Sequence, residues 1–506
     1  MTKTAIFLSA LFMAMVFACH QTNAANLSEE IEDLRKQIQA LQVQIEALAK
    51  QKVPSPPRGA YEKAEETEKT GEKQSEVMPG VKIKLGGYIE TTGIWRSKNQ
   101  TQDTSTTWNG NSSNTTGIPF ANNVNAHQSE FRGSVRASRL SLSTEGVVDN
   151  NLKLSAYLES DFLGAARTAN SVQTNGYTPR LRHAFAEVNH SGLGIKFVSG
   201  QTWSLAVLNK ESINTLGTLT TAAIDTGYLP GTVALRTPQI RAVKSFEKEN
   251  ISIGISAESP QVNFGQVSVP STVTAATFGH VASFNPNVQY STDLAPDIIG
   301  KAAYDSGIGH YELFGIMRFF RDKLNADFRD NTVIAGGGGI GAYWQLLSKK
   351  IEVHTSFVGG EGIGRYSSGR FPDFSFAPNG AIKPITRYSG TIGIIGHPSK
   401  SWDVYLYAGY DAVFRNNEEN TMYGYGNYSL DNSGCYAANE SCPAQTSSMW
   451  QISPGFWKQF YKGDCGTMRV GASYSLTRRN AFSDANGNAP HAYQNVIMTA
   501  LRYAPF

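Results

Sequence analysis

Apolar and polar residues alternate along most of the chain, and this two-residue period is clearest near its end. Ile497, Leu501 and Tyr503 lie at odd-numbered positions, whereas Arg502 lies at an even-numbered one. Successive side chains of a β-strand point to opposite faces. One face would therefore be apolar and the other polar, as in a transmembrane barrel strand with lipid on one side and a wet lumen on the other.

Strands of this kind begin at residue 81, and the polar connections between them alternate in length. Seven short connections lie at 148–150, 189–194, 247–250, 305–307, 347–349, 397–400 and 463–466. Eight long connections lie at 97–133, 164–180, 202–236, 260–294, 321–331, 366–383, 416–447 and 479–494. This arrangement predicts an all-β fold, a 16-stranded antiparallel transmembrane β-barrel with both ends on the short-turn side. A soluble propeller or sandwich is the alternative.

The first 24 residues have the features of a secretory signal peptide. Lys3 supplies a positive start, residues 5–18 are apolar, and Thr22-Asn23-Ala24 offers small residues for cleavage. A competing interpretation makes Cys19 the lipidated residue of a lipoprotein box. In both interpretations the mature protein leaves the cytoplasm.

Residues 25–52 predict a short N-terminal coiled-coil helix. The apolar positions alternate in spacings of four and three, with Ile at a and Leu at d: Leu27, Ile31, Leu34, Ile38, Leu41, Ile45 and Leu48. A single amphipathic helix packed on the barrel is the alternative. Residues 53–80 contain a run of Glu, Lys and Thr without an apolar period, which indicates a flexible linker. Residues 81–506 are expected to form the barrel.

Composition and cysteine placement narrow the function classes. The formal net charge of +3 and the absence of a basic cluster with interleaved aromatics argue against nucleic-acid binding. Cys435 and Cys442 lie in one long connection, so an oxidising compartment favours a local disulfide between them. Cys465 lies in a short turn on the opposite side of the membrane and is expected to stay a lone thiol.

The sequence gives no sign of catalysis, a metal site or a cofactor. Its histidines are scattered, without an HExxH pair, and no Ser lies in a nucleophile elbow. Residues 336–341 match the glycine spacing of a dinucleotide-binding loop, but Ala342, Tyr343 and Trp344 continue a strand pattern where a helix would be needed. We therefore predict a structural role for these glycines and no enzyme activity.

Charged residues occur in the middle of the predicted strands. Arg or Lys facing lipid at the membrane centre costs ~2–4 kcal/mol, so these side chains are expected to face the lumen. The predicted pore-lining cations are Arg139, Arg182, Arg241, Lys301, Arg318 and Arg502. Generic wetting of the channel is the simpler interpretation, and a basic wall at a constriction is the more specific one.

Seven short segments, in this order, resemble the trimeric outer-membrane porins, most of all the DcaP-like porins. They are Gly86–Ile89, Arg139–Ser141, Glu159–Phe162, Leu181–Phe185, Gly200–Trp203, Tyr461–Asp464 and Leu501–Tyr503. The resemblance implies a sixteen-stranded barrel with a coiled coil, a homotrimer, and a third loop folded into the lumen. That loop, 202–236, would place Glu211 and Asp225 opposite the basic wall. The long inserts at 97–133 and 416–447 have no counterpart that we can name.

These observations predict a Gram-negative outer-membrane porin with its N-terminal segment in the periplasm. Small polar solutes would diffuse through it passively, with a mild preference for anions. The expected partners are outer-membrane lipid and lipopolysaccharide, and the barrel-assembly machinery, which would engage the terminal Phe506. Two alternatives remain: a ligand-selective uptake channel for a carboxylate or an iron chelate, and a non-channel protein for adhesion or cell-wall interaction.

Overall fold

The structure is a computed structural model. It describes residues 74–78, 80–100, 117–164, 178–220, 222–263, 268–273, 293–324, 329–416 and 422–505. The predicted signal peptide, the coiled coil, most of the linker and the terminal Phe506 lie outside these residues. All described residues belong to one compact unit, Glu68–Phe506.

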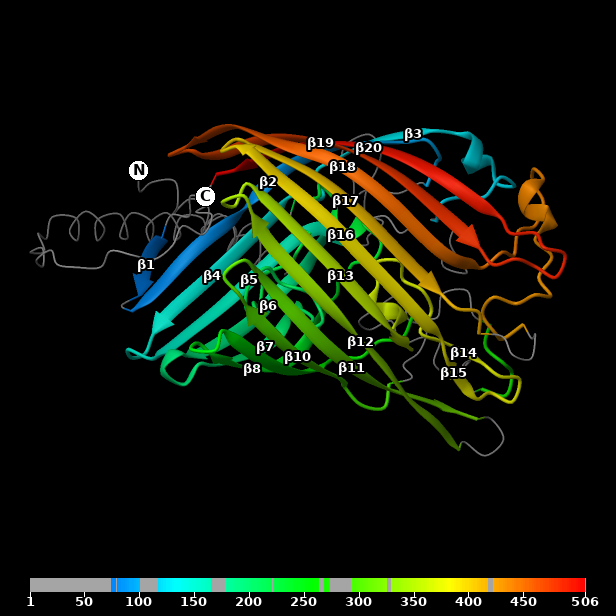
Figure 1. Cartoon of the computed structure of the whole chain (residues 1–506), viewed down its shortest axis with the longest axis horizontal. Coiled ribbons are helices and arrows are strands. Elements are labelled where there is room, and N and C mark those ends of the chain that lie inside the picture. Colours follow the sequence, from blue (N-terminus) through cyan, green and yellow to red (C-terminus); the bar gives the residue numbers. More distant parts are fainter. Residues whose placement is uncertain are drawn as a thin grey trace, which may run out of the picture. The chain divides into compact units, whose positions relative to one another are not determined.

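In the described part of the chain, sixteen antiparallel strand positions form one closed sheet (Figure 1). The strands are β2 (Val81–Arg96), β3 (Glu130–Ser134) with β4 (Arg139–Val147), β5 (Leu152–Gly164), β6 (Thr178–His190), β7 (Ile195–Trp203), β8 (Arg236–Phe246), β9 (Ile251–Glu258), β10 (Asp297–Asp305), β11 (Gly309–Lys323), β12 (Asp330–Leu346), β13 (Ile351–Glu361), β16 (Thr386–Ser399), β17 (Trp402–Val413), β18 (Thr446–Gly463), β19 (Gly466–Ala481) and β20 (His491–Ala504). The predicted strand number and fold class are confirmed.

Each strand pairs with its neighbour in sequence, and the last strand closes the sheet onto the first. β3 and β4 share one position, because both pair with β2. β20 pairs with β2 from Ile89↔Tyr503 to Arg96↔Val496. β1 (Gln74–Met78) pairs with the start of β2, ahead of the barrel start predicted at residue 81.

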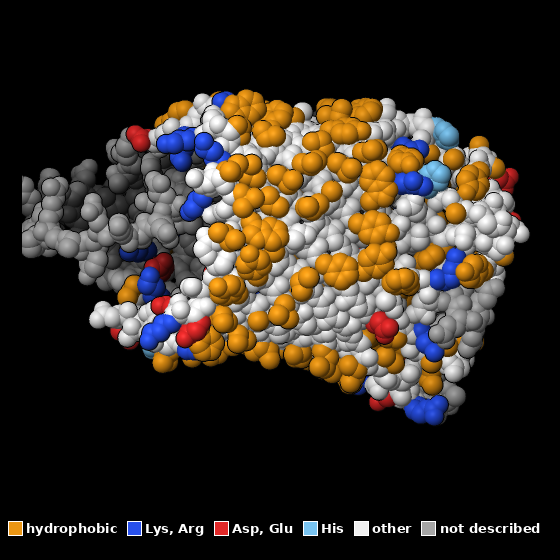
Figure 2. All heavy atoms as spheres, viewed as in Figure 1, with side chains coloured by type: hydrophobic (Ala, Val, Ile, Leu, Met, Phe, Trp, Pro, Cys, Tyr) orange, Lys and Arg blue, Asp and Glu red, His pale blue; other side chains and the backbone are white. Residues whose placement is uncertain are grey.

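The outer surface of the barrel carries an apolar band that follows from the two-residue period. In β9, Ile251, Ile253 and Ile255 are exposed, whereas Ser252 and Ser256 are buried on the inner side. Figure 2 shows hydrophobic side chains across the middle of the wall, with charged side chains towards its two ends. Such a band suits contact with lipid. Among the described residues, no helix is long and apolar enough to cross a membrane.

The glycine run 336–341 lies within β12, as the strand interpretation predicts. A Cβ atom on Gly338 would lie 2.5 Å from the carbonyl oxygen of Phe314 on the neighbouring strand. The run therefore allows a close approach of strand backbones, which is a structural role.

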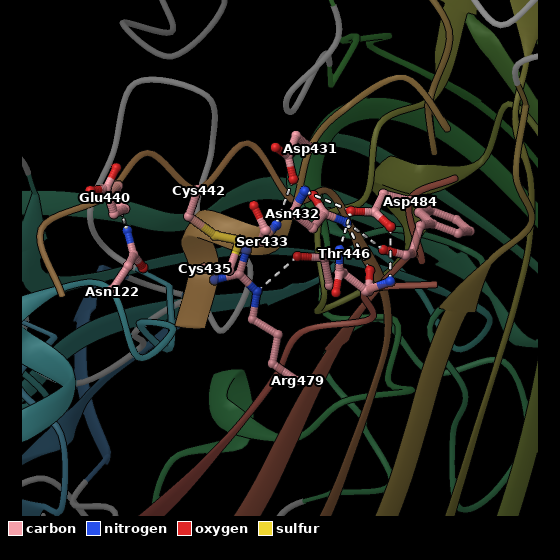
Figure 3. The surroundings of a disulfide bond; sticks show 12 residues. Asn122, Asp431, Asn432, Ser433, Cys435, Glu440, Cys442, Thr446, Arg479 and Asp484 are labelled. Carbon is pink, nitrogen blue, oxygen red and sulfur yellow. Dashed lines mark hydrogen bonds between the residues drawn. A yellow bond between two sulfur atoms is a disulfide. The ribbon is translucent and has the colours of Figure 1, made fainter. Parts of the chain in front are cut away.

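The predicted disulfide is confirmed: Cys435 and Cys442 are bonded, with Cα atoms 4.5 Å apart. The bond closes a compact loop that begins in the short helix η6 (Ser433–Tyr436). Figure 3 shows Asn122, from the connection after β2, beside this loop, where its Nδ2 donates to the Glu440 carbonyl at 2.9 Å. The disulfide thus fixes a surface on which two long connections meet. Among the described cysteines, Cys465 is free and exposed.

Candidate functional site

The connection between β7 and β8, called here inner loop 204–235, runs along the inside of the barrel wall. It is described except for residue 221. Its backbone is held by carboxylates on three strands: Leu205 N donates to Glu258 at 2.8 Å, Asn209 N to Glu312 at 3.0 Å, and Ser212 N to Asp305. Two side chains of the loop extend this attachment: Lys210 donates to Glu352 at 2.7 Å, and Thr215 donates to Glu187 at 2.7 Å.

The inner loop also has an apolar side that packs against the wall. Leu205, Leu208 and Ile213 are buried with Val243, Ile299 and Phe314 in one hydrophobic cluster. A Cβ on Gly341 would lie 2.6 Å from Leu208, so this wall glycine leaves space for the loop. Further along, Trp457 Nε1 donates to the carbonyl of Ala222 at 2.9 Å. The loop therefore contacts opposite parts of the barrel and narrows the lumen.

A second connection, between β13 and β16 and called here inner loop 362–385, also packs inside the barrel. It contains the hairpin β14 (Phe374–Phe376) and β15 (Ile382–Pro384). Phe371, Phe374, Phe376 and Ile385 are buried against Phe320 and Tyr425. We did not predict this inward path, because the segment was assigned to an ordinary long outer loop.

Buried ion pairs hold inner loop 362–385 to the wall. Arg318, fully buried on β11, contacts Asp297 at 3.2 Å and Asp373 at 2.6 Å, and donates to the Gly362 carbonyl at 2.7 Å. Arg387 on β16 pairs with Asp411 on β17 at 3.3 Å and donates to the Tyr366 carbonyl of the loop at 2.9 Å. Burial raises the pKa of the Asp373 carboxyl above its usual value, despite the attraction of Arg318.

The two inner loops and the wall enclose a cavity of about 610 Å³ on the side of the long connections, called here the arginine cavity. Among the described residues, seven arginines and four carboxylates line it, a formal excess of three positive charges. The arginines are Arg139, Arg180, Arg182, Arg236, Arg365, Arg370 and Arg502, and the acids are Glu90, Glu159, Asp161 and Asp225.

Most of these arginines are bound to the acids of the same wall. Arg182 contacts both Glu159 and, at 2.9 Å, Asp161. Arg180 binds Asp161 with two hydrogen bonds, of 3.0 and 2.6 Å. Arg502 on β20 pairs with Glu90 on β2, directly opposite it at the closure of the barrel. The carboxylates therefore fix the positions of the guanidinium groups and moderate their field.

A second cavity of about 570 Å³, the short-turn cavity, lies at the other end of the lumen. Lys82 and Glu145, close to the short connections, are among its lining residues. Tyr157 on β5 and Leu216 on inner loop 204–235 line both cavities. The boundary between the two spaces therefore lies at this pair.

Of the eight predicted pore-lining residues, four line the arginine cavity, one lines the short-turn cavity and three line neither cavity. Arg139, Arg182, Arg502 and Asp225 line the arginine cavity, and Glu211 lines the short-turn cavity. The other three, Arg241, Lys301 and Arg318, line neither of these cavities.

These three cations are buried against the inner loops or the wall beside them. Lys301 Nζ donates to the Val207 carbonyl at 2.7 Å, and Arg241 donates to the Trp203 carbonyl at 2.5 Å. Asp225 accepts from Gly227 N at 3.0 Å, so part of its acceptor capacity serves the local turn.

The sequence reasoning missed four arginines of this site. Arg180 has the same parity as Arg182 in β6, so its inward direction could have been predicted. Arg236 begins β8 directly opposite Trp203, where the strand boundary was uncertain from sequence. Arg365 and Arg370 belong to inner loop 362–385, and no period in that segment indicates its inward path.

Known proteins resemble this chain in fold and not in sequence. No protein-family model matches the chain, and no curated protein matches it by sequence. The structure resembles the outer membrane channel DcaP of Acinetobacter baumannii, with a TM-score of 0.59, 15% identity, and coverage of 85% of this chain and 99% of that chain. OmpF of Salmonella typhi, solved in complex with daunomycin, matches with a TM-score of 0.48, 10% identity, and coverage of 85% and 100%. An anion-selective porin from Comamonas acidovorans matches with a TM-score of 0.46, 11% identity, and coverage of 84% and 99%. This chain thus shares the barrel fold of the DcaP channel.

Proposed function

We propose that the protein is an outer-membrane porin through which small polar solutes diffuse, with a mild preference for anions. The observation that carries this proposal is the pair of cavities inside a closed barrel, which share Tyr157 and Leu216 in their linings. Their volumes of about 610 and 570 Å³ are in the range that accommodates small molecules. The apolar outer band and the likeness to an outer-membrane channel support the location.

The charge of the arginine cavity supports the anion preference. Guanidinium groups stay ionised at any working pH, so the seven positive charges do not depend on protonation, and four ionised carboxylates leave an excess of three. The short-turn cavity is lined by three lysines and four carboxylates among the described residues, a formal excess of one negative charge. An anion would be attracted on one side of the boundary and released on the other, as conduction requires.

Assembly and processing remain predictions from the sequence. We expect a homotrimer whose N-terminal coiled coil extends into the periplasm after signal cleavage. The coiled coil and signal peptide lie outside the described residues, and contacts with lipopolysaccharide or the assembly machinery involve other molecules. Nothing in the proposed permeation route depends on them.

Planar-bilayer recording of the refolded full-length protein tests the proposed function. We expect a steady ohmic conductance, because the two cavities would form one water-filled path. Heat-denatured protein at the same concentration is the control. Complete block by one solute at low concentration would favour the ligand-selective uptake channel. Absence of any conductance from folded, inserted protein would contradict the porin and favour the interaction protein.

A further inference from the structure

Two uncharged side chains, called here the neck, separate the arginine cavity from the short-turn cavity. Tyr157 on β5 and Leu216 on inner loop 204–235 are the only described residues that line both cavities. Leu216 is 40% exposed, although its loop packs against the wall. Arginines or lysines, together with carboxylates, line the cavities on either side. A solute that crosses the boundary therefore leaves charged surroundings and passes an aromatic ring and an aliphatic side chain.

The loop side of the neck is fixed to two strands of the wall. Thr215, the residue before Leu216, donates from Oγ1 to Glu187 on β6 at 2.7 Å. The Thr215 carbonyl accepts from Thr202 Oγ1 on β7 at 3.0 Å. Leu216 N donates to Asn214 Oδ1 at 3.1 Å within the loop. The position of Leu216 is thus set by the wall, and the polar groups next to it are already hydrogen-bonded.

The wall side of the neck is fixed in the same manner. The Tyr157 hydroxyl donates to Glu159 at 3.0 Å, and this carboxylate also contacts Arg182 and, at 3.7 Å, Arg139. The Tyr157 ring lies with its centroid 5.9 Å from that of Phe185, which lines the short-turn cavity. Because the hydroxyl proton is used within the wall, Tyr157 contributes chiefly its ring to the neck.

We propose that the neck selects among permeating anions by how firmly they hold water, so that the channel favours weakly hydrated anions over strongly hydrated ones of equal charge. An ion that enters an apolar constriction loses water, and the polar groups beside this neck are occupied and cannot replace that water. Thiocyanate gives up water at a smaller free-energy cost than chloride, and chloride at a smaller cost than fluoride. This selection rests on the proposed porin function and adds to it, because the positive charge of the arginine cavity attracts all three anions.

Reversal potentials measured with different potassium salts on the two sides of a bilayer test the neck. The wild-type channel should be most permeable to thiocyanate, less to chloride and least to fluoride, with a spread wider than that of their mobilities in water. Leu216→Asn nearly keeps the size of the side chain but adds an amide that can replace water, so the spread should fall to that of the mobilities. Leu216→Met keeps the neck apolar and should retain the order.

Leu163→Asn is the matched control, because it makes the same chemical change at another residue of β5. Leu163 lines the arginine cavity and not the short-turn cavity, so this variant should retain the wild-type order. Circular dichroism checks that each variant is folded. A wild-type order that follows the mobilities, or an order that survives Leu216→Asn, would overturn the neck in a channel that conducts. Absence of any current from folded, inserted wild-type protein would instead refute the porin function.

Discussion

Replacing Glu312 by alanine is expected to raise the single-channel conductance and make the current noisy. Glu312 on β11 is a main attachment point of inner loop 204–235. One carboxylate oxygen accepts from Asn209 N at 3.0 Å, and the other from Asn209 Nδ2 at 3.0 Å and Lys301 Nζ at 3.1 Å. Removing the carboxylate leaves a buried ammonium unpaired, which costs ~3–5 kcal/mol. If the loop left the wall, water could reach the Lys301 ammonium and this cost would fall. We therefore expect the loop to detach and the lumen to widen.

Two variants make the Glu312 experiment specific. Glu312→Gln keeps an acceptor for Asn209 but removes the charge that pairs with Lys301, so its effect should be intermediate. Glu247→Ala, in an exposed short turn, should behave as the wild type. Bilayer recording measures the conductance, and limited proteolysis followed by mass mapping measures exposure of residues 204–235. Unchanged conductance in a folded Glu312→Ala channel would mean that this attachment does not limit the current.

Replacing Arg318 by alanine should detach inner loop 362–385 and lower the melting temperature. The substitution removes the cation that Asp297 and Asp373 share, at a cost of ~3–5 kcal/mol. Of its ion pairs within the described chain, Asp297 keeps only the longer contact with Arg365 at 3.6 Å. Arg318→Lys should recover part of this loss, because an ammonium keeps the charge but lacks the fork that reaches both acids and the Gly362 carbonyl. Arg321→Ala, on the same strand and outside both cavities, is the matched control.

The Arg318→Ala defect should diminish as the pH falls. The pKa of Asp373 is already raised by burial, and loss of Arg318 removes an attraction that favours the charged form. An acid whose pKa is higher in the folded than in the unfolded state stabilises the fold when protonated, and this stability is lost as the pH rises through the folded-state pKa. Thermal unfolding at several pH values measures the effect. If the stability difference between Arg318→Ala and the wild type grew towards low pH, this prediction would be contradicted.

The sequence could predict the barrel because lipid and lumen impose opposite requirements on alternate residues. β9 illustrates this, since Ile251, Ile253 and Ile255 face outward whereas Ser252 and Ser256 face inward. The alternation of short and long connections then determined the strand number. The disulfide was predictable from the closeness of Cys435 and Cys442 in one connection.

The interior was less predictable because parity gives the face of a residue but not its surroundings. Arg241, Lys301 and Arg318 have the inward parity, yet the inner loops and neighbouring wall residues occupy the space before them. Sequence also could not distinguish a polar outer loop from inner loop 362–385. The burial of Phe371 and Phe374 depends on Phe320, Tyr425 and other distant residues that only the closed barrel brings together.

The reversal potential of the wild-type channel in a KCl gradient tests the central claim most directly. With ~0.1 M salt on the dilute side the Debye length is ~10 Å, so the field of the arginine cavity acts on ions within it. We predict a reversal potential displaced towards the chloride equilibrium potential, and a smaller displacement when both solutions are concentrated. A reversal potential displaced towards the potassium equilibrium potential would contradict an anion-preferring channel lined by these arginines.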